Sequence, residues 1–558
     1  MGTTVADTVI DALLAEGVER VYGVPGDAIN ALLDSMRRRS KRIQFILTRH
    51  EETAALTAAY EAKLTGRLAV CVGTGGPGAI HLLNGLYEAK MEGVPVLALT
   101  GQVALPMIGT DYFQEVDLVR LFGDVTVFNQ MLVSPESAGL MVERAIRAAR
   151  TERGVAHLNL PEDLARAPSN HSFRASPINY AQASAVPSSA QIRAAQERIA
   201  HGQRIVLLVG KGARAARSEV LELAERLRAP IVKTLHGKDL LADDHPMALG
   251  GVGLLGTRPA QDALEQADTL LMVGTSYPYT QFLPTHAQVI QIDRAPEQIG
   301  KRYPVDVALV GDAQETLRAL LSGVPARSDE SFLAAGRQAM AKWRAAQAAA
   351  EGDNSTPIRP QRVARELARA IGPTGVVSVD VGTVTVWMAR NFPVSDGQRL
   401  LFSGWLATMG SGLPGAMAAQ WVHPDRRVAA AVGDGGFAMT LTDFVTAVRY
   451  QLPIVVVVFN NGKLAFIQFE EEVEGFPDYG TDLVNADYAA WARACGGVGY
   501  TVHDPAQLAP TLDRAFADRR PTVVDVFTRP DERPMPPHVT LSQAAGFAKS
   551  LLREKFFP

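Results

Sequence analysis

Short stretches of Val, Ile and Leu alternate with helical patterns along the whole chain. The segment 428–461 is typical: an apolar strand, a glycine-rich turn, the helix-like run TLTDFVTAVRYQ, Pro453 and a second apolar strand, IVVVVF. Apolar strands that alternate with helices are typical of parallel sheets with both faces covered. We therefore expect an α/β protein built from parallel sheets.

Two stretches of different composition interrupt this pattern. Residues 165–191 are rich in Ser, Pro and Ala, and within 344–361 a helical run gives way to Gly, Asn and Pro. Such segments are typical of linkers, and they divide the chain into three blocks of similar size. The predicted parts are domains 1–170, 185–340 and 355–530 and a C-terminal tail 531–558.

The first and third blocks contain similar units, 68–101 and 428–461. Each reads as strand, glycine-rich turn, helix, proline and strand, and alignment places Thr74 at the position of Asp434. Units of α/β structure resemble one another in general, and that explanation stays open. The alternative is a duplicated fold in which one copy holds a metal diphosphate and the other holds something else.

Polar residues follow both strands of the second unit. The turn 433–436 reads Gly-Asp-Gly-Gly, and Asn460 and Asn461 follow the strand IVVVVF. The carboxyl ends of neighbouring parallel strands bring a carboxylate and an amide together. Carboxylate, amide and carbonyl oxygens suit Mg²⁺, which also binds phosphates. Glycines let backbone N–H groups approach a diphosphate beside a helix N-terminus, so we predict a magnesium diphosphate site here.

Composition narrows the class of protein. The 558 residues are 47% hydrophobic, carry a formal charge of −4 and contain no basic block that would favour nucleic acid. Cys71 and Cys495 match no metal spacing, and we expect both to be buried thiols in a reducing compartment. No apolar run approaches the ~20 residues of a membrane span. No secretory signal opens the sequence, and we expect a cytoplasmic enzyme.

The GDG and NN motifs, at this separation, resemble the signature of thiamine diphosphate enzymes. The phrases GVPGDAINALLD, TRHEETAA, GTDYFQEVD, DVGTVTVWMAR and TMGSGLPGAMAAQ extend the resemblance over essentially the whole chain. It is closest to pyruvate oxidases, including the quinone-linked pyruvate dehydrogenases. The resemblance implies three Rossmann-like domains: related first and third domains for the pyrimidine and diphosphate ends of the coenzyme, and a central domain of the flavin-binding type. The implied cofactors are thiamine diphosphate, Mg²⁺ and FAD.

The resemblance also implies roles for residues around the coenzyme. Glu51 would hydrogen-bond the pyrimidine ring, although a Glu at a helix start is also a common partner of the helix dipole. Met409 would wedge the coenzyme into its bent shape, although a Met beside glycines is often core filling. The implied metal ligands are Asp434, Asn461 and the carbonyl of Lys463. The other implied coenzyme contacts are Gly382, Thr383, Thr408, Gly433, Gly435 and Gly436.

The central block carries weaker signals. Its LLVGKGARAA segment has a GxG turn after a strand, which fits any Rossmann-like unit. Asp293 ends the strand VIQID, where a carboxylate could bind a ribose hydroxyl. An acid at a strand end is also common by chance, so both interpretations stay open. By resemblance, FAD would contact Gly253, Leu254, Leu255, Gly256, Thr275, Ser276, Tyr277, Pro278, Tyr279 and Asp293. Some relatives lack flavin in this domain, and acetolactate synthases keep it without redox use.

The implied reaction is oxidative decarboxylation of pyruvate through an enamine on the coenzyme, with electrons passing to FAD and then to quinone or oxygen. The alternative is a non-oxidative carboligase such as acetolactate synthase. Phe113, Gln114 and the pair Gly26-Asp27 match positions that face the reacting carbon, and Phe466 matches an aromatic between thiamine and flavin. The alternative is that Phe113 and Phe466 are core residues and Asp27 is an N-cap. His81 is either a pocket base or a surface residue.

The resemblance extends to assembly. In relatives the pyrimidine domain of one chain faces the diphosphate domain of another, so we expect a homo-oligomer, a dimer of dimers. Quinone-linked relatives carry a long lipid-binding C-terminal segment. Here the corresponding stretch is only LLREKFFP. This stretch is too short for a stable lipid-lying helix. We therefore expect membrane association to be peripheral at most.

Overall fold

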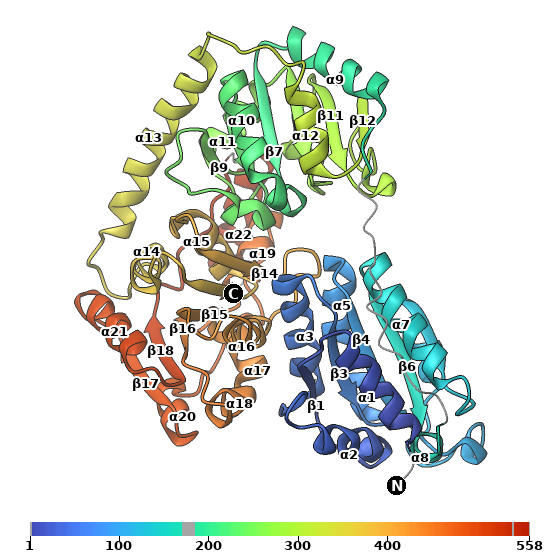
Figure 1. Ribbon diagram of the computed structural model, residues 1–558. Helices are drawn as coiled ribbons and strands as arrows, with labels where there is room; N and C mark the ends of the chain where they lie inside the picture. The colour runs from blue at the N-terminus through green and yellow to red at the C-terminus, as the bar shows by residue number, and fades with distance from the viewer. Residues whose placement is uncertain (1–2, 170–184, 538–540, 557–558) are drawn as a thin grey trace.

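The computed structural model describes residues 3–169, 185–537 and 541–556. It contains three α/β units, each built on a six-stranded sheet of parallel strands (Figure 1). The predicted α/β class with three parallel sheets is thus confirmed. Most of the predicted linker 165–191 lies outside the described residues, as does Phe557 in the tail.

The first and third sheets share one strand order. The order is β2-β1-β3-β4-β6-β5 in the first and β14-β13-β15-β16-β18-β17 in the third. Numbered within each sheet, both read 2-1-3-4-6-5, which confirms that these two domains are related in fold. The first sheet comprises β1 (Arg20–Gly23), β2 (Gln44–Leu47), β3 (Ala69–Gly73), β4 (Val96–Gln102), β5 (Thr126–Met131) and β6 (Val155–Pro161). The third comprises β13 (Val376–Val379), β14 (Arg399–Phe402), β15 (Val428–Gly433), β16 (Ile454–Asn460), β17 (Val498–Val502) and β18 (Thr522–Phe527).

The central sheet has a different order, β12-β11-β10-β7-β8-β9. Numbered within the sheet and read from its other edge, this is 3-2-1-4-5-6, the strand order of the Rossmann fold. Its strands are β7 (Ile205–Val209), β8 (Ile231–Lys233), β9 (Ala248–Gly251), β10 (Thr269–Val273), β11 (Gln288–Asp293) and β12 (Val307–Val310). The switch in chain direction lies between β7 and β10, which are hydrogen-bonded neighbours.

Helices cover both faces of each sheet (Figure 1). In the first domain they are α1 (Val5–Ala15), α2 (Asn30–Arg38), α3 (Glu51–Thr65), α4 (Pro77–His81), α5 (Leu83–Glu92), α6 (Leu118–Leu121), α7 (Ala138–Glu152) and α8 (Glu162–Arg166). The next are α9 (Ser189–His201), α10 (Arg217–Leu227), α11 (Arg258–Gln266), α12 (Ala313–Leu321) and α13 (Ser331–Glu351). The last are α14 (Pro360–Ile371), α15 (Thr383–Asn391), α16 (Gly412–Val422), α17 (Asp434–Thr440), α18 (Phe444–Arg449), α19 (Ala465–Glu474), α20 (Tyr488–Ala494), α21 (Pro505–Ala517) and α22 (Leu541–Phe556). Helix α13 continues past the predicted domain end at residue 340 and leads to the third domain.

Helix α3 consists mostly of small residues. Its alanines, including Ala55, are buried, and a Cβ atom on Gly85 of α5 would come within 2.5 Å of the Ala55 Cβ. On its other side a Cβ atom on Gly415 of α16 would come within 2.6 Å of the Tyr60 ring. α3 therefore packs closely against helices of both the first and the third domain. This contact fixes the start of α3, where Glu51 lies, relative to the third sheet.

The run TLTDFVTAVRYQ is not the single helix that we predicted. It forms the end of α17, a 3₁₀ turn (Leu441–Asp443) and α18. The Thr440 hydroxyl donates to the Gly410 carbonyl at 2.9 Å, and the Asp443 carboxylate accepts from the Arg49 N–H at 2.8 Å. Side chains that bond to other backbone groups compete with regular helix, and here they tie the break to two neighbouring segments.

Two smaller expectations need correction. Cys71 is buried, which raises its pKa to about 12, but Cys495 is half-buried. Residues 551–556 do not stand alone, because they complete α22. This helix packs on α19: a Cβ atom on Gly546 would meet the Val473 carbonyl oxygen at 2.0 Å, and the Ser550 hydroxyl donates to the Phe476 carbonyl at 2.8 Å. Within the described residues, every helix is too short or too polar to cross a bilayer.

Candidate active site

The predicted diphosphate site lies at the point where the strand order of the third sheet reverses. Strands β13 and β15 are neighbours there, and the chain leaves them at Asp380 and Asp434. Ligands of open α/β sheets bind at such switch points, outside the carboxyl ends of the strands. The predicted glycine-rich turn is not a loop: β15 ends at Gly433, and Asp434 is already the first residue of α17.

Asp434 is held in one orientation by its neighbours. Its carboxylate accepts hydrogen bonds from the N–H groups of Gly435 (3.0 Å) and Gly462 (2.7 Å) and from Nδ2 of Asn485 (2.7 Å). The side chain is 2% exposed, and burial raises its pKa, while these bonds oppose the shift. A buried carboxylate with fixed oxygens is suited to a divalent cation.

The other predicted metal ligands lie close together in sequence, just after the next strand, β16. Oδ1 of Asn461, just after β16, accepts the Lys463 N–H at 3.0 Å. The Lys463 ammonium is paired with Asp478 and, at 2.8 Å, with Asp482. A carboxylate, an amide oxygen and a backbone carbonyl are the oxygen donors that Mg²⁺ takes, so the residues present fit the ion. The Gly435 N–H is engaged by Asp434 in this structure, and its predicted bond to diphosphate stays a prediction.

Sequence reasoning missed the groups that support Asp434. Nδ2 of Asn485 bonds both Asp434 and Oδ1 of Asn460 (3.0 Å), and Nδ2 of Asn460 donates to Asp525 at 3.0 Å. Burial raises the pKa of Asp525 to about 6. The Tyr488 hydroxyl donates to the Asp434 carbonyl at 3.0 Å. Asn485 lies in an irregular segment without a strand or motif to mark it, so the sequence held no signal for it.

Asp380 is a second missed residue. It follows β13, is 1% exposed, and accepts the Val381 N–H at 2.8 Å. Its Oδ2 has no hydrogen-bond partner among the described residues, and a Cβ atom on Gly436 would lie 2.6 Å from it. Gly436 is therefore required by close approach to Asp380, whatever it donates to a ligand. Burial raises the pKa of Asp380 to about 7.

The raised pKa of Asp380 predicts a pH-dependent stability. The folded chain holds this proton more tightly than the unfolded chain, whose Asp pKa is 3.8, so the contribution of Asp380 to stability falls as pH rises from about 4 to about 7 and is then constant. At 1.36 kcal/mol per pKa unit, the loss approaches about 4 kcal/mol. Asp380→Asn should remove this dependence. The melting temperature of the variant, relative to that of the parent, should therefore rise between pH 5 and pH 7. A difference that is constant with pH would contradict the assignment.

One cavity of about 2000 Å³ joins the third domain to the central domain. Nearly all predicted coenzyme contacts of the third domain line it, and a Cβ atom on Gly435 would lie 3.5 Å from the Met409 methyl. These lining residues are Gly382, Thr383, Met409, Gly433, Asp434, Gly435, Gly436, Asn461 and Lys463. Thr408 does not line the cavity but lies beside Met409. Phe466 lines it and also packs against the core of the third domain, and its place between two cofactors stays a prediction.

The predicted flavin segments line the other end of the same cavity. They are Leu254, Leu255, Thr275, Ser276, Tyr277, Pro278, Tyr279 and Asp293. Gly253 and Gly256 are buried instead: Gly253 has φ +82°, and a Cβ atom there would lie 1.9 Å from the Tyr277 hydroxyl. Asp293 ends β11, accepts the Ala295 N–H at 3.0 Å, and has a pKa raised by burial.

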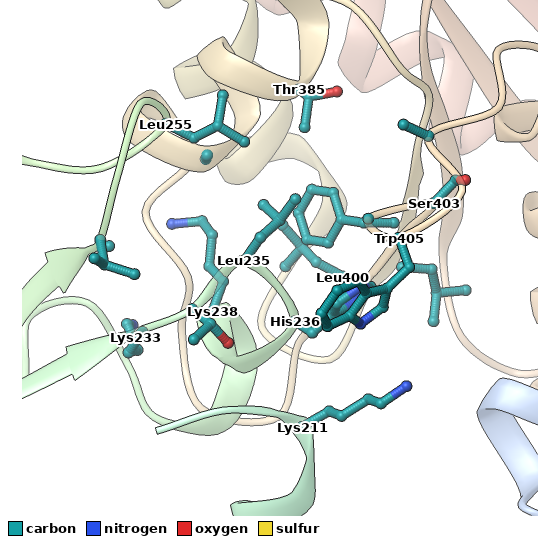
Figure 2. A pocket seen from close by; sticks show the side chains of 18 of the residues that line it. Lys211, Lys233, Leu235, His236, Lys238, Leu255, Thr385, Leu400, Ser403 and Trp405 are labelled. Atoms are coloured by element: carbon teal, nitrogen blue, oxygen red, sulfur yellow. The ribbon is translucent and has the colours of Figure 1, made fainter. Parts of the chain in front are cut away.

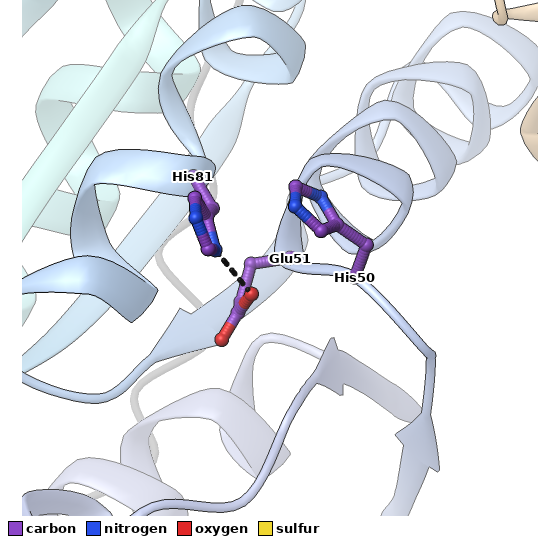
Figure 3. A group of neighbouring side chains, drawn as sticks. All are labelled: His50, Glu51 and His81. Carbon is purple, nitrogen blue, oxygen red and sulfur yellow. Dashed lines mark hydrogen bonds and ion pairs between the residues drawn. The ribbon is translucent and has the colours of Figure 1, made fainter. Parts of the chain in front are cut away.

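Glu51 lies in the first domain, at the first residue of α3, and is 7% exposed. Its Oε2 lies 3.0 Å from Nδ1 of His81, and the His50 ring stacks on the His81 ring with centroids 4.4 Å apart (Figure 3). Ring nitrogens of stacked imidazoles point side by side rather than at one point, and His50 Nδ1 already accepts the Glu52 N–H at 3.2 Å. Glu51 and His81 are thus joined by a hydrogen bond, and His50 stacks on His81.

The remaining predicted residues lie near the switch point of the first sheet. Asp27 follows β1, and its Oδ1 lies 3.3 Å from the Thr74 hydroxyl, which follows β3. Asp27 is the first residue of a 3₁₀ turn whose N-cap is Gly26, so it is not itself the N-cap. Phe113 is 75% exposed and is not a core residue, and Gln114 has φ +63°. Within the described chain, Glu51, Phe113 and Gln114 do not line the large cavity.

Comparisons with known proteins agree with this architecture. Three family models match in order: "Thiamine pyrophosphate enzyme, N-terminal TPP binding domain" over 3–121, the central domain of the same enzymes over 192–320, and their "C-terminal TPP binding domain" over 380–526. The chain therefore belongs to the thiamine pyrophosphate (thiamine diphosphate) enzyme family.

Relatives match over almost their full length. The chain is 44% identical to a putative thiamine pyrophosphate-containing protein, YdaP, of Bacillus subtilis, over 99% of this chain and 96% of that protein. It is 34% identical to the pyruvate oxidase of Lactiplantibacillus plantarum (95% and 89% covered). It is 32% identical to a probable acetolactate synthase large subunit of Methanocaldococcus jannaschii (95% and 93% covered).

Proposed function

We propose that this enzyme carries out the oxidative decarboxylation of a 2-keto acid, with pyruvate as substrate and FAD as the first electron acceptor, which quinone or oxygen then reoxidises. One observation carries the proposal: a single cavity connects the Asp434 site with the switch point of a Rossmann-type sheet, and Phe466 is among the residues that line it. Two cofactors that exchange electrons need such a connection. The similarity to a pyruvate oxidase supports this choice of reaction.

In this proposal the third domain binds the diphosphate end of thiamine diphosphate. Asp434, Asn461 and the carbonyl of Lys463 would hold Mg²⁺, Asn485 fixes the Asp434 carboxylate, and Met409 would contact the coenzyme. When bound, the coenzyme supplies an electron sink for decarboxylation. Glu51 donates or accepts the hydrogen bond that tunes the pyrimidine ring, in a buried position where such a bond is strong.

FAD fits the end of the cavity that the central domain lines. The strand order is that of a dinucleotide-binding fold, and the ligand would lie across β7 and β10. Asp293 offers a carboxylate at a strand end for a ribose hydroxyl. Basic side chains that line this part suit the pyrophosphate, and they are Lys211, Arg214, Arg294, Lys301 and Arg302.

We further propose that the active site forms between two chains, in at least a dimer and finally a dimer of dimers. Glu51 and Asp434 are both needed, yet Glu51 does not line the cavity of its own chain. Apolar side chains near Glu51 are exposed, with Ile80 at 44% and Phe113 at 75%, and so is Met439 of α17, at 61%. A second chain would cover these surfaces and complete the site.

A non-oxidative carboligase is the second candidate. It is favoured by the near full-length similarity to acetolactate synthases, including isozyme 3 of Escherichia coli at 30% identity over 92% of each chain. In that case FAD would be bound without exchanging electrons.

The two candidates predict different results with purified enzyme under anaerobic conditions. If our proposal is right, pyruvate should bleach the visible absorbance of the bound flavin within the time of turnover, because the flavin accepts the electrons of the reaction. Absorbance spectra after mixing measure this. A panel of other 2-keto acids tests the substrate, and readmitted oxygen or a quinone tests the acceptor.

A flavin that stays oxidised while acetolactate accumulates would establish the carboligase instead. Purified enzyme without FAD, and unable to bind added FAD, would contradict the oxidative proposal altogether.

A further inference from the structure

The segment Ser403–Met409 joins β14 to the start of α16 and is contacted by all three domains. Ser403 and Trp405 border the cavity beside Lys211 and His236 of the central domain (Figure 2). Within the segment Ala407 has φ +58°, a left-handed conformation that a residue with a Cβ atom seldom adopts. Contacts from outside the segment must therefore hold it in this shape, and two separate sets of contacts do so.

The first domain holds the two ends of the segment. Glu88 of α5 is 0% exposed; its Oε2 accepts the Ser403 hydroxyl at 2.7 Å, and its Oε1 accepts the Lys63 ammonium. The same ammonium donates to the Phe402 carbonyl at 2.9 Å. A buried carboxylate is stable when both oxygens are paired. Glu88 is thus fixed within its own domain by Lys63 and presents its second oxygen to the third domain.

Ser403 connects Glu88 to Thr408, which precedes Met409. While its hydroxyl donates to Glu88, its oxygen accepts the Thr408 N–H at 3.0 Å. Asn84 of α5 donates to the Thr408 hydroxyl at 2.9 Å and to Oε1 of Glu52 at 2.6 Å. Thr408 precedes Met409, and Glu52 follows Glu51. The position of Met409 therefore depends on bonds that begin in the first domain.

The central domain holds the middle of the segment. The Arg302 guanidinium lies over the Trp405 ring, 5.0 Å from its centroid, and its Nη1 donates to the carbonyl (3.0 Å) and hydroxyl (3.1 Å) of Ser276. The His236 ring lies against Gly404, where a Cβ atom would come within 2.4 Å of Nε2. Ser276 belongs to a segment that lines the flavin end of the cavity. A ligand that fixes Ser276 and Arg302 would also fix Trp405.

We propose that the segment Ser403–Met409 couples the two ends of the cavity. This inference rests on the proposed function. FAD bound at Thr275–Tyr279 fixes Arg302 against Trp405, and the segment then holds Met409 ready for thiamine diphosphate. Ser403 and Trp405 are positioning residues, because they act through Met409 and Thr408 rather than on the reacting atoms. Coupling between two binding sites is reciprocal, so each cofactor raises the affinity for the other by the same factor.

The coupling is measured by calorimetric titration of full-length protein stripped of both cofactors. Thiamine diphosphate with Mg²⁺ is titrated with and without saturating FAD, and FAD is titrated with and without thiamine diphosphate and Mg²⁺. In the parent, FAD should lower the Kd for thiamine diphosphate by a factor between about 5 and 150, the usual range of coupling between sites. The reverse titration should give the same factor.

Variants of the segment assign the coupling to it. Ser403→Ala removes the link between Glu88 and Thr408, and Trp405→Leu removes the ring under Arg302; both should reduce the factor to about one, while thiamine diphosphate still binds. Ser403→Thr keeps the hydroxyl and should restore it. Ser322→Ala, whose hydroxyl donates to Ala319 at the end of α12, is the matched control and should leave the factor unchanged.

The outcomes separate this inference from the proposed function. FAD that binds without changing the Kd for thiamine diphosphate overturns the coupling and leaves the proposed oxidation intact. If FAD lowers the Kd for thiamine diphosphate in both Ser403→Ala and Trp405→Leu by the same factor as in the parent, other residues carry the coupling. This result overturns the role of the segment. Failure of the parent to bind FAD overturns both the coupling and the flavin step of the proposed function.

Discussion

Asp434→Ala is expected to abolish the magnesium-dependent binding of thiamine diphosphate. The carboxylate is the charged member of the proposed ligand set, and it is oriented by three hydrogen bonds. Loss of an outer partner of a metal ligand costs about 10–100-fold in affinity, and loss of the ligand itself should cost more. Asn485→Ala, which removes such a partner, should fall within that range. Calorimetric titration with thiamine diphosphate and Mg²⁺ measures both effects.

The control for this series is Asp482→Ala. Its carboxylate is 87% exposed and pairs with the Lys463 ammonium, so it belongs to the same region without facing the ion in our assignment. Its affinity for the coenzyme should stay close to that of the parent. Parental affinity in Asp434→Ala would refute the metal site and, with it, the placement of the coenzyme in this domain.

Glu51→Gln is expected to stop turnover while the coenzyme still binds. Glutamine has nearly the same shape and still forms a hydrogen bond, but it cannot exchange a proton with the pyrimidine ring. General acid–base groups typically contribute 10²–10⁴-fold to rate, and turnover of pyruvate should fall by about that factor. Steady-state rates and titration of thiamine diphosphate, measured on the same preparation, separate the two effects.

Glu52→Gln is the matched control for Glu51→Gln. Glu52 is the adjacent carboxylate and bonds Asn84 at 2.6 Å, so its loss should weaken a contact but leave proton exchange at the coenzyme intact. Turnover should fall far less than in Glu51→Gln. A Glu51→Gln enzyme with parental turnover would refute the catalytic assignment of that residue.

The two inactive variants together test whether sites form between chains. In a mixed dimer of Asp434→Ala and Glu51→Gln, one of the two shared sites would contain both an intact Glu51 and an intact Asp434. Dissociation and reassembly of the mixture should therefore restore activity that neither variant has alone. No recovery in a confirmed mixed dimer would show that each chain builds its own site.

The sequence was sufficient to place Asp434 and Asn461 because both follow buried strands. Parallel strands end at one edge of a sheet, so strand pattern alone brings their following residues together. The α/β class followed for the same reason, because apolar strands and helical runs are local patterns. The alanines of helix α3 reflect close packing between two domains.

What the sequence did not reveal depends on contacts between distant segments. Asn485 reaches Asp434 from an irregular segment, and no pattern of its own marks it. The burial of Asp380 arises from its close approach to Gly436, which follows another strand. The helix break at 440–443 is set by bonds to Gly410 and Arg49, and the half-burial of Cys495 likewise follows from tertiary packing.

The common strand order of the first and third sheets gives the assembly a direction. Both copies present the same kind of crevice, but Thr74 stands where the other copy has Asp434, so one of the two crevices lacks the acid that magnesium needs. Two identical crevices facing each other across an interface would compete for the same end of the coenzyme. In the proposed dimer, a single coenzyme would then bridge unlike halves in one orientation, and like halves would gain nothing from meeting.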